Sequence, residues 1–307
     1  MYRFGLGVLA TGLFGSLRNM AARQKLKMDN IEKYIPEQIK EKVMKKKKKG
    51  VAGKLLALGI GIAGVIAGVS AAKLIKNKIT KKAVILVGSD TPQIGHCAFN
   101  GYLVKYTDLD GLDAMTEALA EDEFTELIIV PMTVINGYEA EKIRNIMTYK
   151  KDLFESVKFV PALLSSDSDY TYVANVLKAC TENVDEDSAV IYLAKGTTHF
   201  SNSAYIALSE RLKRLDVRNV FIATDSSYPG IDKVMEEIED GHFRNIIICP
   251  FEIYIDDEIR NAMSEENEDS WYNILTDAGY TCGCYYKGLC AYRGIRRLIV
   301  EHTKSVM

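Results

Sequence analysis

Residues 189–214 read AVIYLAKGTTHFSNSAYIALSERLKR, an apolar run followed by a small polar loop and then an amphipathic segment. The apolar run over 189–194 predicts a buried strand, and apolar residues at helical spacing predict a helix over 203–214. A strand followed closely by a helix is the repeating unit of parallel sheets that are covered by helices. This stretch therefore predicts an α/β fold.

The same alternation recurs from residue 80 to residue 307. Further strands are predicted over 83–88, 127–131, 157–161, 218–224, 244–250 and 281–286, and further helices over 111–120, 138–149, 168–181 and 231–239. Ligands of parallel sheets bind beyond the carboxyl ends of the strands, so chemistry is expected just after these runs. Only residues 89–97 separate Gly88 from the apolar stretch 98–106, whereas a parallel crossover needs about a dozen residues or more. We predict that the helix at this connection is missing or very short.

The formal net charge of −2 is the sum of two regions of opposite sign. Residues 1–82 hold 19 Lys and Arg residues and four acidic residues. Residues 83–307 hold 20 Lys and Arg residues and 37 acidic residues. Such an acidic domain is not expected to bind nucleic acid. The composition, 48% hydrophobic and 26% charged, is that of a folded protein and excludes wholesale disorder.

The basic region contains an uncharged apolar stretch, LLALGIGIAGVIAGVSAA, over residues 55–72. A helix of this length measures about 27 Å, close to the ~30 Å hydrocarbon thickness of a bilayer. We predict a basic leader over 1–50 with a short Gly-rich apolar segment, and a transmembrane helix over 51–75; a buried core helix is the alternative. The bilayer would surround Leu55, Gly61, Gly64, Gly68 and Ala72, and the Gly64–Gly68 spacing is compatible with self-association.

The acidic domain is predicted to cover residues 80–307, with lobes of about 80–185 and 186–307. Six cysteines are few for this length and are not spaced like a disulfide framework. This favours a reducing compartment, so the protein is expected at a membrane with its soluble domain facing the cytoplasm.

Three segments at predicted strand ends resemble the anaerobic sirohydrochlorin cobaltochelatases of the CbiK type. They are YLAKGTTHFSNSAYIAL (192–208), similar to GHGTxHxxNxAY; TDSSYPGIDKVMEEI (224–238), similar to VEGYPxxDxVxxxL; and CPFEIYIDDEIRNAMSEENEDSW (249–271), similar to PFMxVAGDHAxNDMAGDxEDSW. Further similar stretches are VINGYEAEKI (134–143), PALLSSDSDY (161–170) and YYKGLCAYRGIRRLIVEH (285–302). The resemblance implies two similar α/β lobes and a cleft in which a tetrapyrrole meets a divalent metal.

The resemblance also implies where the metal would bind, and this chain departs from the pattern there. The family holds the metal with the histidine of GHGT, the glutamate of VEGYP and the histidine of GDHA; these positions are Lys195, Ser226 and Glu258 here. The family often has a further histidine, and the residue at that position in this chain is Thr133. An ammonium repels a divalent cation, so an ion pair between Lys195 and Glu258 is the expected replacement. Glu258 and Ser226 remain as candidate metal ligands.

Lys195, Glu258 and His199 are the positional equivalents of catalytic residues. His199 matches the second histidine of GHGTxH, although a hydrogen-bonded histidine at a helix start is the simpler interpretation. Cys282, Cys284 and Cys290 lack the spacing of a zinc site and are expected to be buried thiols.

We predict a membrane-anchored, catalytically inactive relative of the cobaltochelatases that acts as a binding or assembly module in iron, cobalt or tetrapyrrole handling. A loose similarity of Gly-rich apolar leaders suggests a membrane-bounded iron-storing compartment. The alternative is an active sirohydrochlorin chelatase that inserts Co²⁺ or Fe²⁺ for cobalamin or sirohaem formation with altered site residues. A third hypothesis is a scaffold that oligomerises through its apolar helix. Expected partners are the lipid bilayer, a second copy of the chain, and a tetrapyrrole or a metal-handling protein.

Overall fold

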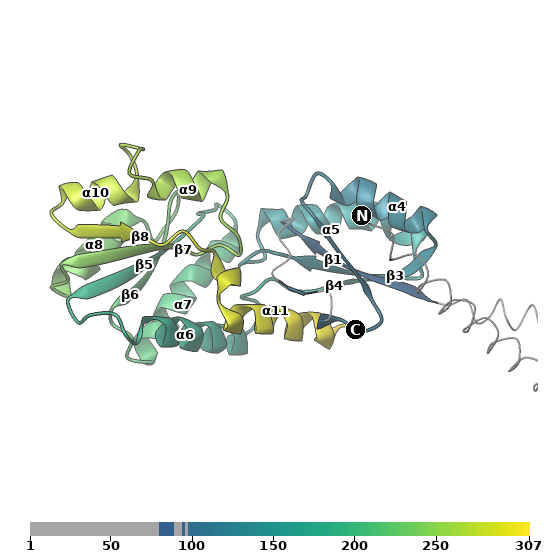
Figure 1. The fold of residues 1–307 in the computed structure, drawn as a ribbon, viewed down its shortest axis with the longest axis horizontal. Helices are drawn as coiled ribbons and strands as arrows, with labels where there is room; N and C mark the ends of the chain where they lie inside the picture. Colours follow the sequence, from purple (N-terminus) through teal and green to yellow (C-terminus); the bar gives the residue numbers. More distant parts are fainter. Residues whose placement is uncertain (1–79, 89–93, 96–97) are drawn as a thin grey trace, which may run out of the picture. The chain divides into compact units, whose positions relative to one another are not determined.

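The structure is a computed structural model that describes residues 80–88, 94–95 and 98–307 (Figure 1). These residues form two four-stranded sheets, with the strand orders β2-β1-β3-β4 and β6-β5-β7-β8. Every strand pair in both sheets is parallel. The predicted α/β class with parallel sheets flanked by helices is therefore confirmed.

The elements follow the predicted alternation closely. The strands are β1 (Lys81–Val87), β2 (Leu103–Thr107), β3 (Phe124–Pro131), β4 (Ser156–Phe159), β5 (Ser188–Ala194), β6 (Val220–Thr224), β7 (Asn245–Pro250) and β8 (Thr281–Cys284). The helices are α4 (Leu112–Glu121), α5 (Tyr138–Lys150), α6 (Asp167–Thr181), α7 (Ser203–Arg214), α8 (Ile231–Asp240), α9 (Asp257–Met263), α10 (Trp271–Asp277) and α11 (Arg293–Ser305). Short 3₁₀ helices are η3 (Lys151–Leu153), η4 (Phe200–Asn202) and η5 (Leu289–Ala291).

Alternate residues of each strand enter different cores, as the period-two geometry of a strand requires. In the first sheet, residues such as Ile85 and Ile129 pack with α4 and α5, while Val84 and Ile128 belong to a larger cluster. This larger cluster also contains one face of the second sheet, including Tyr192. The other face of the second sheet packs with α8, α9 and α10. One apolar cluster thus joins the two sheets.

Two helices cross between the halves of the chain. Helix α6 follows the first sheet in the sequence but packs against α7, which follows β5 of the second sheet (Figure 1). Helix α11 follows the second sheet, yet the Lys158 ammonium of β4 donates to the Met307 carbonyl just beyond α11, at 3.1 Å. The two helices meet where His302 Nε2 and the buried Asp169 Oδ1 lie 2.9 Å apart. The first sheet lies before residue 185 in the sequence and the second sheet lies after it. Helices α6 and α11, however, each contact elements from the other half of the chain.

The connection from β1 to β2 spans residues 88–102, which is about fifteen residues and long enough for a parallel crossover. Its described residues, 88, 94–95 and 98–102, contain no α-helix, although β1 and β2 are parallel neighbours. Residues 89–93 and 96–97 lie outside the described residues, so the missing helix stays a prediction.

The predicted leader over 1–50 and the predicted transmembrane helix over 51–75 lie outside the described residues. The bilayer positions Leu55, Gly61, Gly64, Gly68 and Ala72 lie there too, so the anchor stays a prediction. Within residues 80–88, 94–95 and 98–307, none of the helices combines the length and the apolar character that a membrane crossing needs.

Candidate functional site

Three loops meet at the carboxyl ends of β6, β5 and β7, which are neighbours in the second sheet. The Gly196 N–H donates to Asp225 Oδ1 at 2.7 Å, and the Ser227 hydroxyl donates to the Thr197 carbonyl at 3.0 Å. A Cβ atom added to Gly196 would lie 2.6 Å from the Ser227 nitrogen, so this close approach requires glycine. The loop after β5 is therefore fixed against the loop after β6.

Lys195 lies at the centre of the site. Its ammonium is 2.6 Å from Asp256 Oδ2 and 2.6 Å from Glu258 Oε2. Burial alone would lower the pKa of Lys195, but the hydrogen bonds to Asp256 and Glu258 outweigh it and raise the pKa. The predicted Lys195–Glu258 ion pair is confirmed, and the lysine stays charged.

Asp256 is a second anion that the sequence comparison did not single out. Its carboxylate also accepts the Ile259 N–H at 2.9 Å and caps the start of α9. Burial would raise the pKa of Asp256, but the hydrogen bonds from Ile259 and Lys195 lower it below its usual range. The lysine is thus held by a carboxylate that is itself fixed at a helix start.

Two further carboxyl groups lie close to Lys195. Glu252 accepts the Lys195 backbone N–H at 2.8 Å, and burial raises its pKa to about 8 against the opposing effect of that bond. Burial also raises the pKa of Glu139 at the start of α5, while the positive charge of Lys195 lowers it. Sequence reasoning missed Glu252, although the signal was present: PFEI stands where the quoted family pattern reads PFM.

His199 is nearly buried, with 8% of its surface exposed. Its Nδ1 accepts the Ser201 backbone N–H at 3.2 Å, so its Nε2 carries the proton and donates to Glu141 Oε1 at 3.2 Å. The ring also makes an edge contact with Tyr138 at 4.9 Å between centroids. Both nitrogens are engaged, so this histidine links the loop after β5 to α5, which favours the hydrogen-bonded interpretation.

The remaining predicted positions differ in their surroundings. Ser226 is exposed, and its hydroxyl oxygen lies close to Gly196, where an added Cβ would be 2.8 Å away. Thr133 follows β3 and is buried, and its hydroxyl has no hydrogen-bond partner. In the described part of the chain, no three or more His, Cys, Asp or Glu side chains are grouped so that they could hold a metal ion. The structure brings Lys195 and Glu258 together without assembling a metal-ligand set.

The three cysteines that lack the spacing of a zinc site are buried to different degrees. Cys282 and Cys284 belong to β8 and are partly buried, and Cys290 is fully buried. Burial raises the pKa of all three thiols. This agrees with the expectation of packed thiols rather than a zinc site.

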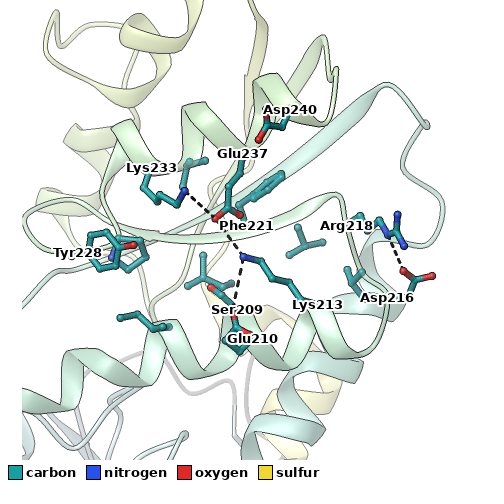
Figure 2. A pocket seen from close by; sticks show the side chains of 16 residues that line it. Ser209, Glu210, Lys213, Asp216, Arg218, Phe221, Tyr228, Lys233, Glu237 and Asp240 are labelled. Atoms are coloured by element: carbon teal, nitrogen blue, oxygen red, sulfur yellow. Dashed lines mark hydrogen bonds and ion pairs between the residues drawn. The ribbon is translucent and has the colours of Figure 1, made fainter.

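A separate hollow of about 550 Å³ follows the free edge of β6 between α7 and α8 (Figure 2). Lys213 of α7 reaches across it to within 3.4 Å of Glu237 on α8, and it lies 3.9 Å from Glu210 on its own helix. Figure 2 shows Lys233 approaching Glu237 from the other side, at 3.9 Å. Charged side chains beside an edge strand are a common protection of sheet edges.

The parallel two-sheet fold of this chain is the fold of solved chelatase structures. It is similar to SirB from Bacillus subtilis with Fe³⁺, with a TM-score of 0.52 and 13% identity over 74% of this chain and 95% of that chain. SirB from Bacillus subtilis subspecies spizizenii in complex with cobalt gives the same TM-score, with 12% identity and the same coverage. At such identities the similarity concerns the fold alone.

Residues 103–307 match the family described as cobalt chelatase (CbiK), and the chain therefore belongs to this family. It is 25% identical over 210 residues to the sirohydrochlorin cobaltochelatase of Salmonella typhimurium, covering 66% of this chain and 78% of the relative. It is 22% identical over 201 residues to the sirohydrochlorin cobaltochelatase CbiKC of Nitratidesulfovibrio vulgaris, covering 64% and 71%. The resemblance stated from the motifs is confirmed.

Proposed function

We propose that this chain uses the chelatase fold as a binding or assembly module in metal or tetrapyrrole handling and does not insert metal through the family's ligand positions. The observation that carries the proposal is the Lys195 ammonium, which lies 2.6 Å from both Asp256 and Glu258. It stands at the first metal-ligand position that the family pattern implies. A resident cation there takes the electrostatic place of a metal ion.

Electrostatics supports this reading. A divalent ion about 4 Å from the ammonium would meet a repulsion of roughly 8 kcal/mol at an effective dielectric constant of about 20. Ser226 offers only a neutral hydroxyl, and His199 has no free nitrogen lone pair. The site therefore favours an internal ion pair over a bound Co²⁺ or Fe²⁺ substrate.

Attachment to a membrane is part of the proposal. The uncharged stretch over 55–72 and the excess of basic residues in 1–82 support it. Cell fractionation of the full chain should place it in the membrane fraction, with the acidic domain protected from protease added outside the cell. Recovery of the full chain in the soluble fraction without detergent would contradict the attachment.

An active chelatase is the second candidate, and Glu252 favours it. Metal insertion needs a base that accepts protons from the pyrrole nitrogens, and a carboxyl group with a pKa of about 8 exchanges protons near neutral pH. Glu258 could then serve as a ligand once Lys195 swings away. This candidate predicts that the chain inserts Co²⁺ or Fe²⁺ into sirohydrochlorin.

One experiment separates the two candidates. The full chain is incubated with sirohydrochlorin and Co²⁺ or Fe²⁺, and insertion is followed by absorbance against a reaction without protein. We expect no acceleration. Insertion that is lost in Glu252→Gln would instead establish the active chelatase.

A variant tests the reason for inactivity. The triple change Lys195→His, Ser226→Glu and Glu258→His restores the family's implied ligands, and it should give micromolar or tighter Co²⁺ binding in calorimetric titration. Lys213→His, in the hollow beside β6, is the matched control, and it should not give tight Co²⁺ binding. Tight Co²⁺ binding by the unchanged chain would refute the electrostatic argument.

A further inference from the structure

Three arginines converge on a second hollow, of about 350 Å³, at the start of α11. The hollow is lined by Arg293, Arg296 and Arg297 together with the apolar side chains of Ile94, Ala98 and Val300. The surrounding domain is strongly acidic, with 37 acidic residues against 20 basic ones in residues 83–307. Three guanidinium groups within five residues therefore form a local exception to the charge of the domain.

Of the three arginines, only Arg297 pairs with a carboxylate among the described residues. Arg297 pairs with Glu301 at 2.8 Å, but its side chain is 71% exposed, so this pair is weak. Arg293 is exposed and forms no ion pair with any residue in the described part of the chain. The first turn of α11 contains no acidic residue. A cation at a helix N-terminus is unfavourable, because the N-terminal end of a helix is itself positive. The basic residues here thus oppose the local stability of the helix.

Arg296 is fixed in place by the backbone. Its Nη1 donates to the Cys290 carbonyl at 2.5 Å and to the Ala291 carbonyl at 2.9 Å. These bonds use one nitrogen of the guanidinium and hold the side chain at the hollow. A preformed guanidinium next to two exposed ones is suited to a planar or tetrahedral oxyanion, which accepts paired N–H bonds.

The hollow lies where ligands of parallel sheets bind. The segment just before α11 is attached to the residues after β7, because the Leu289 N–H donates to the Glu252 carbonyl at 2.8 Å and the Cys290 N–H donates to the Ile253 carbonyl at 3.1 Å. Ile94 belongs to the connection that leaves the carboxyl end of β1. Both elements therefore place the hollow beyond carboxyl strand ends.

We propose that this hollow is an oxyanion-binding site in which Arg293 and Arg297 close on a carboxylate or phosphate group that Arg296 orients, while the apolar floor contacts the rest of the ligand. The same chemistry could come from a free phosphate, from a small organic carboxylate or from the headgroup of an anionic lipid. The proposal does not depend on whether the chain inserts metal.

The test uses the full chain and three probes: inorganic phosphate, glutarate, and vesicles of phosphatidylglycerol compared with phosphatidylcholine. Phosphate and glutarate are titrated at low salt with the unfolding temperature as readout, and vesicle binding is measured by co-sedimentation. The double variant Arg293→Gln with Arg297→Gln should weaken binding of at least one probe tenfold or more. The probe that responds identifies the source of the oxyanion.

The matched control removes the same charge elsewhere. Lys213→Gln with Arg218→Gln takes two positive charges from the hollow beside β6, and it should leave binding within twofold of the unchanged chain. Because the leader is basic in all variants, its own attraction to anions cancels in this comparison. Equal weakening in both double variants, or no saturable binding of any probe, would overturn the proposal.

A charge-conserving variant distinguishes geometry from net charge. Arg293→Lys with Arg297→Lys keeps both charges but loses the paired donors of the guanidinium, so binding should fall between that of the unchanged chain and that of the glutamine variant. This variant also decides the case if circular dichroism shows that the glutamine variant is misfolded. Binding equal to that of the unchanged chain would then count against an oxyanion site built from guanidinium groups.

Discussion

Replacing Lys195 by methionine removes the ammonium that lies between Asp256 and Glu258 and keeps a flexible side chain. The three side chains are 39%, 50% and 66% exposed, so solvent screens both ion pairs. Exposed pairs contribute about 0.2–1 kcal/mol each, and the variant also leaves two carboxylates without a shared cation. We therefore expect a loss of about 1–2 kcal/mol in the free energy of unfolding.

The loss can be measured by thermal unfolding of the full chain at pH 7 and low salt. The domain unit runs from Ile79 to Met307, and for this size 1 kcal/mol shifts the unfolding temperature by about 2–4 °C. The expected decrease is about 2–8 °C, and it should shrink in 1 M NaCl. Lys213→Met is the control, because its carboxylate contacts are longer, at 3.4 and 3.9 Å, and it should lose less than about 0.5 kcal/mol.

The pH dependence gives an independent check. The folded pKa of Asp256 is lower than its ordinary value of 3.8, so the ion pair stabilises the fold above that value and its contribution disappears as the pH falls through the folded pKa. Because the pKa of Lys195 is raised above 10.5, the contribution is fully present below pH 10.5 and is lost as the pH rises through the folded pKa. A variant as stable as the unchanged chain at pH 7 and low salt would refute the reasoning that Lys195 is held as a cation.

Three further predictions concern other residues. Asp169→Asn removes a buried carboxylate that accepts four hydrogen bonds. It should reduce the free energy of unfolding, measured in urea, by about 2–4 kcal/mol. The control is Asp167→Asn, which should change this free energy little because the Asp167 side chain is 82% exposed. Because the fold raises the pKa of Glu252 from 4.5 to about 8, stability should increase as the pH falls from 8 towards 4.5; an equal slope in Glu252→Gln would contradict this. Gly196→Ala should lower the free energy of unfolding by about 2–4 kcal/mol, measured by thermal unfolding, because the added Cβ would lie 2.6 Å from a backbone nitrogen. In the control Gly283→Ala, the added Cβ meets no atom within 4 Å, so the free energy of unfolding should change by less than about 0.5 kcal/mol.

The sheets were predictable from the sequence where their strands are continuous apolar runs. In β5 all seven residues are buried, and such a run between polar residues has few other structural solutions. β2 was harder to place, because Lys105 interrupts the apolar pattern and both Leu103 and Lys105 are exposed in this edge strand. The crossing of α6 and α11 could not be predicted, because the apolar face of a helix does not indicate which sheet it will cover.

The candidate site was predictable only in part. The family pattern located Lys195 and Glu258, and opposite charges at facing positions indicated an ion pair. Asp256 was missed because its role as a helix cap depends on where α9 begins. The environment of Glu252 was missed because a raised pKa reflects burial by segments distant in the sequence.

The exchange of α6 and α11 between the halves of the chain affects how the protein is made. One face of the first sheet is buried in a cluster whose helical members come from α6, α7 and α11. Since α11 ends at Ser305, that face stays incompletely covered until the ribosome has released the residues of α11. Neither half can complete its core alone. A nascent chain stalled near residue 185 should therefore stay protease-sensitive and depend on chaperones, and the two halves should become protected together.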